Sequence, residues 1–348
     1  MLSPQSQCLL RQKDLFSQGK WLLVNPVDSF IFRELPASVQ GFHQYFDQYL
    51  AAKQSGSNSH HFGVTYSLEQ DSAASADGMK AKFDGIVLYL PKTKKHTIWL
   101  LKHLSGLLNK DGLLCIVGEN KGGIKSCGKL LEAVGSAANK IESARHCSVY
   151  ASVVSSPSTF DLGSELSWTD TSINQQQLSL ASLPGVFSHG ELDAGTRLLL
   201  ENVNKVPGGR VLDFACGNGV IAQYVSQLNP GAQLFMSDIN ALALYCAQHS
   251  MQKATSPPQI IASNGLKQVE GQFNAIYSNP PFHTGIANDY SISQQFIADA
   301  AQKLYKGGEL WLVANRFLPY AEHLHRHFGR FQRAAETTKF TLYRCIKT

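Results

Sequence analysis

The chain has 348 residues, more than the roughly 100–200 residues of an ordinary single domain, so we expect two domains. Apolar residues make up 43% of the sequence and charged residues 16%, which excludes intrinsic disorder as the main state. The formal net charge is +5, and no apolar run reaches the roughly 18 residues of a membrane-spanning helix.

The N-terminal sequence and the cysteines indicate the compartment. Residues 1–7 contain neither the basic region nor the apolar stretch of a secretory signal. The 7 cysteines include no CxxC pair, which argues against a disulfide framework and against a zinc finger. We therefore expect a cytoplasmic protein without membrane contact, whose cysteines are buried apolar residues.

The first half contains apolar runs of strand length and a lysine-rich stretch. The runs are Gly19–Val24, Phe83–Pro91 and Lys110–Val117. Between Lys80 and Lys129 there are ten lysines against three acidic residues, a local excess of seven positive charges. Such a stretch is either a solvated face or a surface for a polyanion. The candidate contacts for a polyanion are Lys92, Lys94, Lys95, Lys121 and Lys125.

The middle of the chain is polar and has little apolar periodicity. It contains Ser155–Thr159 and Gln175–Gln177, which are rich in the residues of loops. We predict an interdomain connection there, with one short strand near Leu178–Leu180. The predicted division is a first domain over residues 1–155, a linker over 156–180 and a second domain over 181–348.

The second half alternates short apolar runs with longer helical patterns. Predicted strands are Arg210–Ala215, Gln233–Ser237, Gln259–Ala262, Phe273–Ser278 and Gly308–Val313, and predicted helices are 220–228, Ala241–Gln252 and Ser291–Leu304. This alternation predicts a doubly wound α/β domain, because parallel strands need a helix to cross from one to the next. Lys339–Lys347 alternates in the manner of an edge strand.

Three histidines near the end of the chain resemble a metal-binding group. His323, His325 and His327 stand at positions i, i+2 and i+4, which cannot all share one helical face. We therefore expect no metal there.

The two halves match each other in sequence order. Shifts of 190, 190 and 196 residues place Gly19–Val24 on Gly209–Phe214, Phe83–Pro91 on Phe273–Pro281, and Lys110–Val117 on Lys306–Val313. The chemistry is not repeated: Leu23 stands where the second half has Asp213, and 89–92 (YLPK) stands where it has 279–282 (NPPF). We infer a duplicated sheet whose first copy lacks the functional residues of the second.

A glycine-containing turn follows the first strand of the second half. Gly217 and Gly219 let the backbone pass close to a ligand, since a Cβ atom there would collide with it. The third glycine of a dinucleotide fingerprint is absent, which disfavours NAD and FAD. Asp213 can orient an ammonium group, and Asp238, at the end of the next strand, can accept from both ribose hydroxyls. The combination predicts a nucleoside-containing ligand.

The sequence Asn279-Pro280-Pro281-Phe282 follows the fourth strand directly. Two prolines remove two N–H donors and fix φ, so the loop is stiff and its carbonyls point outward. The Asn279 amide oxygen and the Pro280 carbonyl can then accept both hydrogens of an exocyclic amine, which aims the nitrogen lone pair at an electrophilic methyl group. Phe282 offers a stacking face for a flat base or amide. Asn279, Pro280 and Phe282 are therefore the candidate catalytic residues.

With these residues the second half resembles class I S-adenosylmethionine-dependent methyltransferases, in which (D/N/S)PP(Y/F) marks enzymes that act on amino nitrogens. From about residue 8 to residue 347 the chain resembles the bacterial small-subunit ribosomal RNA methyltransferase C family, which makes N2-methylguanine in 16S rRNA. The resemblance rests on Leu183–Ser188, Leu192-Asp193 with Gly195, Ser278–His283 and Val313–Tyr320 in the second half, and on Leu90–Lys92, Val117–Ser126 and Ser143–Cys147 in the first.

The resemblance implies an α/β fold with two tandem Rossmann-like class I methyltransferase domains, the first of them degenerate. It implies S-adenosylmethionine as the cofactor and 16S rRNA within the assembled 30S subunit as the substrate, and we further expect a monomer. One departure is 214–216 (FAC), where relatives commonly have smaller residues; another is Asn264 in place of an acid, although its amide oxygen can contact the adenine amine. The candidate cofactor residues are Asp213, Phe214, Gly217, Gly219, Asp238, Asn264 and Asn279.

Three other functions compete with methylation of a guanine in small-subunit RNA. A protein-glutamine N5-methyltransferase would use the same loop, but the lysine-rich stretch favours RNA. The related large-subunit guanine-N2 enzyme is disfavoured by the motifs at 118–126 and 143–147. A non-catalytic RNA-binding assembly factor has no need of a complete methyl-donor site.

Overall fold

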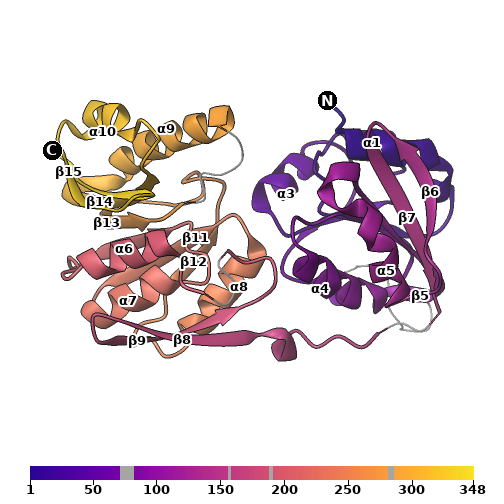
Figure 1. Ribbon diagram of the computed structural model, residues 1–348, viewed down its shortest axis with the longest axis horizontal. Helices are drawn as coiled ribbons and strands as arrows, with labels where there is room; N and C mark the ends of the chain where they lie inside the picture. The colour runs from indigo at the N-terminus through magenta and orange to yellow at the C-terminus, as the bar shows by residue number, and fades with distance from the viewer. Residues whose placement is uncertain (71–81, 156–157, 188–190, 281–285) are drawn as a thin grey trace. The chain divides into compact units, whose positions relative to one another are not determined.

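The computed structural model describes residues 1–70, 82–155, 158–187, 191–280 and 286–348 (Figure 1). The chain divides into two compact units, Met1–Glu165 and Leu166–Thr348. Each unit is built around a seven-stranded mixed sheet with helices on its faces, and each is described by itself below.

The first unit contains strands β1 to β7. The strands are β1 Trp21–Val24, β2 Gln40–His43, β3 His60–Phe62, β4 Phe83–Tyr89, β5 Leu108–Glu119, β6 Asn139–Ala144 and β7 Cys147–Val154. The helices are α1 Pro4–Leu9, α2 Ile31–Glu34, α3 Phe46–Lys53, α4 Lys94–Ser105 and α5 Cys127–Glu132, with short 3₁₀ turns η1 Leu10–Ser17, η2 Leu68–Gln70, η3 Asn120–Gly122, η4 Ile124–Ser126 and η5 Gly163–Glu165.

The second unit contains a hairpin and a second seven-stranded sheet. The strands are β8 Ser167–Ile173, β9 Gln176–Ser182, β10 Arg210–Phe214, β11 Gln233–Asp238, β12 Gln259–Ala262, β13 Phe273–Ser278, β14 Leu304–Asn315, β15 Phe331–Glu336 and β16 Phe340–Ile346. The helices are α6 Ala194–Asn202, α7 Val220–Leu228, α8 Ala241–Ser250, α9 Ile286–Lys303 and α10 Tyr320–Phe328.

The two large sheets have the same strand order. It is β3-β2-β1-β4-β5-β7-β6 in the first unit and β12-β11-β10-β13-β14-β16-β15 in the second, and in both the last two strands run antiparallel to their neighbours. The register agrees as well, since Leu22 pairs with Ile86 and Leu212 with Ile276, both at a shift of 190 residues. The predicted duplication and the class I arrangement are confirmed.

Two apolar cores enclose the second sheet, one on each face. Helices α6, α7 and α8 pack on one face, where Leu199 and Tyr224 meet Val211 of the central strand. Helices α9 and α10 cover the other face, where Phe296 meets Leu212 and Ile276 (Figure 1). Because adjacent residues of a strand point to opposite faces, burial on both sides gives the near-continuous apolar runs of the sequence.

The predicted elements in the middle and at the end of the chain can be compared with the structure. Residues 167–182, which begin within the predicted linker, form the hairpin β8–β9 of the second unit, and the short strand predicted near Leu178–Leu180 lies in β9. Leu178 and Leu180 pack into the core beside α7 and α8. The C-terminal strand β16 is not an edge strand: it lies between β14 and β15. The edge strand on this side of the sheet is β15, whose polar sequence lacks the apolar alternation that predicts a strand. The proposed domain boundaries at 155 and 181 stay a prediction.

The first sheet places apolar and neutral residues where the second has acids. Leu23 occupies the register position of Asp213 and is fully buried, and His43 occupies that of Asp238. These replacements agree with a degenerate first copy.

Sequence predictions about cysteines and membranes can also be compared with the structure. All seven cysteines are free and buried, as predicted. Among the described residues, none of the helices has both the length and the apolar character that crossing a bilayer requires.

Three buried histidines of the first unit are held neutral by their surroundings. The side chains of His43, His96 and His103 are 0%, 3% and 6% exposed. His103 Nε2 accepts the backbone N–H of Tyr66 at 3.0 Å, which requires a neutral ring. Burial lowers the pKa of His43 to about 3 and the pKa values of His96 and His103 to about 4.

We expect the first unit to lose stability as the pH falls from about 6.5 toward about 4. In that window the unfolded chain binds protons on these histidines and the folded chain does not, so each histidine removes up to about 1.4 kcal/mol per pH unit. Thermal unfolding followed by circular dichroism at several pH values measures the loss. The variant His103→Gln keeps a side-chain acceptor but cannot titrate, so its unfolding temperature should fall less steeply with falling pH than that of wild type. If unfolding temperature depended on pH with the same slope in both proteins, the explanation would be contradicted.

Candidate functional site

Polar residues gather at the carboxyl ends of the central strands in the second unit. Asp213 lies in β10, Asp238 ends β11, and Asn279 directly follows β13. Because these strands are parallel neighbours, their carboxyl ends meet at one edge, the usual ligand position in an α/β sheet. Asn264 follows β12 at the same edge.

The turn after β10 bends sharply before α7 begins. Ala215, Gly217 and Gly219 have φ values of 55°, 54° and 82°, in the left-handed region. A Cβ atom added at Gly217 would meet no atom within 4 Å, so the space beside this residue is open. A Cβ at Gly219 would lie 3.2 Å from the Cα and Cβ atoms of Ala247, so this glycine also lets α7 pack closely on α8.

Two acidic side chains support the turn. Asp238 Oδ2 accepts the backbone N–H of Gly217 at 2.9 Å, and its Oδ1 accepts that of Asn240 at 2.9 Å. Asp213 is 2% exposed; its Oδ2 accepts the N–H of Ala222 at 3.0 Å, and its buried Oδ1 has no partner among the described residues. Burial raises the pKa of Asp213 to about 8, and loss of hydration also raises the pKa of Asp238. A cationic ligand group beside Asp213 would favour its ionised form.

The amide of Asn279 is held by the first turn of α6. Its Nδ2 donates to Asp193 Oδ2 at 2.7 Å and to Thr196 Oγ1 at 2.8 Å. Asp193 is also the N-cap of α6, accepting the backbone N–H groups of Gly195 and Thr196. The Asn279 amide therefore has its oxygen directed away from these acceptors.

One pocket joins the glycine turn to Asn279. Its lining residues come from the turn after β10, from α6 and α7, and from the segments that precede α6; they include Ala215, Cys216, Gly217, Asn279, Asp193 and Thr196. Burial raises the pKa of the Cys216 thiol well above its usual value, which agrees with a packing role rather than a nucleophilic one.

The remaining predicted site residues have varied surroundings. Phe214 stacks on Phe296, with ring centroids 4.3 Å apart, and its carbonyl accepts the hydroxyl of Ser278. Pro280 is buried, and the backbone N–H of Asn264 donates to Gln268. Phe282 lies outside the described residues.

Sequence reasoning missed the role of Asp193 and Thr196. Both stand more than 80 residues before Asn279, and nothing local in the sequence links them to it. A signal did exist in the duplication: 190 residues earlier stand Ser3 and Ser6, also polar residues at the start of a helix.

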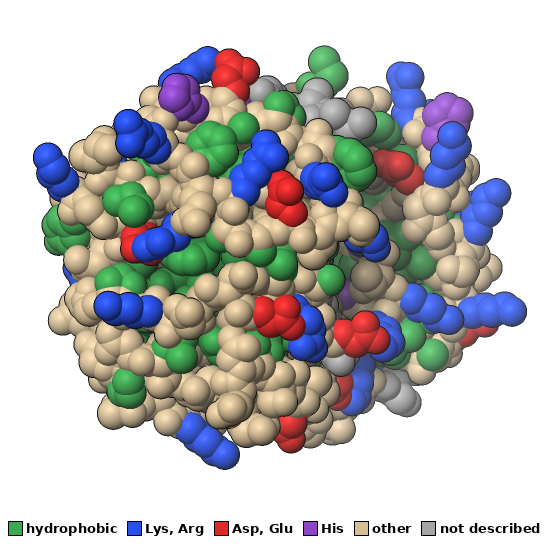
Figure 2. Space-filling model, turned by 60° about the vertical axis from the view of Figure 1, so that its left-hand side comes forward, with side chains coloured by type: hydrophobic (Ala, Val, Ile, Leu, Met, Phe, Trp, Pro, Cys, Tyr) green, Lys and Arg blue, Asp and Glu red, His purple; other side chains and the backbone are tan. Residues whose placement is uncertain are grey.

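The five predicted RNA-binding lysines of the first unit lie at the carboxyl ends of two parallel strands. Lys92 follows β4, Lys94 and Lys95 form the first turn of α4, and Lys121 and Lys125 follow β5. All five are exposed. Figure 2 shows Lys and Arg side chains over the whole of one face, some of them beside acidic side chains.

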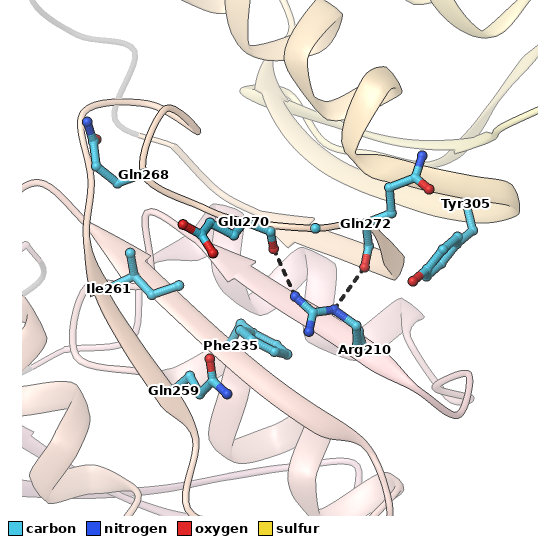
Figure 3. A pocket seen from close by; sticks show the side chains of 9 residues that line it. Arg210, Phe235, Gln259, Ile261, Gln268, Glu270, Gln272 and Tyr305 are labelled. Carbon is cyan, nitrogen blue, oxygen red and sulfur yellow. Dashed lines mark hydrogen bonds between the residues drawn. The ribbon is translucent and has the colours of Figure 1, made fainter.

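A larger cavity of about 520 Å³ lies at the opposite, amino-terminal ends of the second sheet's strands (Figure 3). Arg210 crosses it, donating to the backbone carbonyls of Glu270 and Gln272 at 2.8 and 3.0 Å, and stacks on Phe235. This arginine is engaged in holding the loop before β13, and none of the predicted site residues lines the cavity.

Within the described part of the chain, no group of histidine, cysteine and acidic residues could hold a metal ion. In α10, His323 is buried and His325 is exposed, and His323 lies 2.9 Å from Gln294 Nε2. The three histidines of this helix do not share one face.

Two family models match the chain. The model described as "Methyltransferase small domain" matches residues 177–344, and "Methyltransferase small domain N-terminal" matches residues 6–168. The chain is 47% identical to a ribosomal RNA small subunit methyltransferase C of Pseudoalteromonas atlantica and 38% identical to one of Alteromonas mediterranea, and both comparisons cover 99% of each sequence.

A solved structure has the same fold. The T. thermophilus 16S rRNA N2 G1207 methyltransferase, in complex with AdoMet and guanosine, matches with a TM-score of 0.81. The match covers 99% of this chain and 92% of that one at 22% identity. The likeness shows that the fold of this chain, with two class I methyltransferase-like units in tandem, is that of a known protein.

Proposed function

Since the chain belongs to the ribosomal RNA small subunit methyltransferase C family, we propose that it transfers a methyl group from S-adenosylmethionine to the exocyclic N2 amine of a guanine in 16S rRNA. One observation carries the proposal: the glycine turn and the Asn279 amide line the same pocket. A donor held at the turn and an amine held at Asn279 would therefore meet.

The residues of the turn fit the cofactor. The space beside Gly217 is open, and the buried Asp213 Oδ1 lacks a partner among the described residues, so it can accept from an ammonium group directly or through water. Asp238 has further lone pairs for the ribose hydroxyls. Phe214, Gly219 and Asn264 complete the proposed set. When bound, S-adenosylmethionine supplies an electrophilic methyl group on a sulfonium.

The residues after β13 prepare the amine. The Asn279 oxygen accepts one N–H of the target amine and the Pro280 carbonyl accepts the other, which leaves the nitrogen lone pair free to form the new N–C bond while the S–C bond breaks. The amine then loses one proton to water or to a carbonyl. Phe282 supplies a stacking face for the base in this proposal.

The lysines at the carboxyl edge of the first sheet would hold the RNA. Lys92, Lys94, Lys95, Lys121 and Lys125 are exposed, and phosphate contacts from such a group need no base sequence. We place the reaction in the cytoplasm, on 16S rRNA within the assembled 30S subunit, with the enzyme acting as a monomer.

Incubation with S-adenosylmethionine carrying a labelled methyl group tests the function. Parallel reactions contain unmethylated 30S subunits, naked 16S rRNA, 50S subunits and total protein. We expect label in N2-methylguanine of 16S rRNA, with 30S subunits the best substrate. Label in 50S RNA or in protein, or none in any reaction, would contradict the proposal.

Replacing Asp238 with alanine should weaken S-adenosylmethionine binding by about 1.5–3 kcal/mol, since a hydrogen bond to a charged group is lost. Isothermal titration calorimetry measures the affinity and the number of sites. We expect one site for the whole chain, because His43 and Leu23 replace both acids in the first unit. Two sites, or an affinity unchanged by Asp238→Ala, would contradict the assignment.

A further inference from the structure

The first turn of α6 fixes the orientation of the Asn279 side chain. We propose that Asp193 and Thr196 are positioning residues: they bind the amide nitrogen of Asn279 and so make its oxygen the end available to the target amine. The inference rests on the proposed function, because Asn279 is the residue that receives the amine.

The chemistry of Asp193 decides which way the amide points. An ionised carboxylate can only accept hydrogen bonds, and its Oδ2 lies 2.7 Å from Asn279 Nδ2. Turning the amide over would place two acceptor oxygens against each other. A reversed amide would also offer N–H donors to the substrate, which suits a carbonyl or hydroxyl oxygen and not an amine. The orientation therefore favours a nitrogen that carries hydrogens.

A glycine allows the contact to form. A Cβ atom added at Gly195 would lie 3.0 Å from Asp193 Oδ2 and 3.2 Å from Asn279 Nδ2, so a side chain there would crowd both partners. The Asn279 amide thus lies close against the start of α6, and a side chain at position 195 would require both partners to shift by a few tenths of an ångström.

The first unit holds a different group at the same three positions. Tyr89, Ser3 and Ser6 stand 190 residues before Asn279, Asp193 and Thr196. There the Ser6 hydroxyl lies 2.9 Å from the Tyr89 hydroxyl, and Ser3 caps α1. The polar contact between helix and strand end is retained in the copy, but the amide is gone. The carboxylate there comes from Asp28, whose Oδ2 accepts the Ser6 hydroxyl at 2.6 Å and the backbone N–H of Ser3 at 2.9 Å, so it holds the start of the helix and no amide.

Two substitutions remove the contacts and keep the helix. Asp193→Ser retains a good N-cap, as Ser3 shows in the first unit, but its shorter side chain cannot reach Asn279. Thr196→Val keeps the shape and removes the acceptor. In each variant we expect kcat for RNA methylation to fall at least about tenfold while the Kd for S-adenosylmethionine stays within about threefold. Thr196→Ser restores the hydroxyl and should recover most of the lost kcat.

If the two residues had a merely structural role, each substitution would change the unfolding temperature, kcat and the Kd for S-adenosylmethionine together, and Thr196→Ser would not recover kcat. That result would overturn the proposal. So would a kcat within about threefold of wild type in both variants.

A second readout is independent of activity. The NMR signal of the Asn279 side-chain NH₂ is assigned by its absence in the Asn279→Ala variant. In the wild-type protein this NH₂ group should exchange its hydrogens slowly with water. The Thr196→Val substitution should accelerate that exchange. If exchange is slowed but the wild type methylates no RNA, the proposed function fails and the positioning stands. If exchange is fast in the wild type, the positioning fails whatever the activity.

Discussion

Replacing Asn279 with alanine is expected to lower the rate of methyl transfer about 100-fold or more while S-adenosylmethionine binding remains nearly intact. The Asn279 oxygen would accept from the amine as its nitrogen becomes tetrahedral, an interaction that is strongest in the transition state. The cofactor is expected to depend instead on the Gly217 turn and Asp238. Single-turnover methylation with saturating enzyme, together with calorimetric titration of the cofactor, measures the two quantities separately.

The control for this variant is Asn202→Ala. Asn202 ends α6, and its Nδ2 donates to the carbonyl of Leu198 in the same helix, at the far end from Asp193. Its loss should leave the methylation rate near that of wild type. A turnover of Asn279→Ala within about threefold of wild type, or a large loss of cofactor affinity, would remove Asn279 from the amine-binding role.

Reversing three lysines of the first unit should weaken RNA binding with little effect on the cofactor. If Lys92, Lys94 and Lys95 each neutralise one phosphate, changing them to glutamate lowers the slope of log affinity against log salt by roughly 2–3. At about 0.1 M salt this corresponds to an affinity loss of about 100-fold or more, which shrinks as salt approaches 1 M. Filter binding over a salt series measures the slope.

The position of two of these lysines provides a test against misfolding. Lys94 and Lys95 lie in the first turn of α4, which contains no acidic residue. Positive charge at a helix N-terminus is unfavourable, and an acidic residue there contributes about 0.3–1 kcal/mol. The triple variant should therefore unfold at a higher temperature than wild type while binding RNA more weakly. Damage to the fold would instead lower both the unfolding temperature and the affinity for RNA.

A matched variant controls for net charge. Lys205, Lys253 and Lys306 are exposed in the second unit, away from the carboxyl ends of its sheet. Changing these three to glutamate alters the net charge equally. Equal losses of RNA affinity in the two triple variants would show a nonspecific charge effect and contradict the proposed RNA surface.

The central strands could be predicted from sequence because they are buried on both faces. Phe273–Ser278 was predicted with the bounds that the structure has, since it is a short apolar run next to turn residues. The edge strand Gln259–Ala262 was also predicted with its observed bounds, although it is only partly buried. The strand β15 was missed because most of its side chains are at least partly exposed, so Gln332, Arg333 and Glu336 hide any alternation. Of the hairpin β8–β9, the short strand near Leu178–Leu180 was predicted and lies in β9, whereas β8 was missed because most of its side chains are exposed.

The site could be predicted only where its residues follow strands directly. Asp213, Asp238 and Asn279 were found because strand ends are visible in the sequence. The partners of Asn279 depend on how α6 packs across the sheet edge, which local sequence does not specify. The sequence alone also could not show whether Gly219 is needed for ligand binding or for helix packing. Its close approach to Ala247 of α8 is visible only in the structure.

The chain contains two sheets with the same strand order. This creates a folding problem, because a strand of one sheet can pair wrongly within the other sheet. The loss of acids from the first copy opposes this exchange. If β10 entered the first sheet, Asp213 would be placed where the fully buried Leu23 lies, without the N–H of Ala222. If β1 entered the second sheet, Leu23 would replace Asp213, and the N–H of Ala222 would have no carboxylate to accept it. Each misassembled form leaves a buried polar group unpaired, at about 1–3 kcal/mol or more. The replacement of Asp213 by Leu23 in the first copy would thus also favour the pairing of each strand within its own sheet.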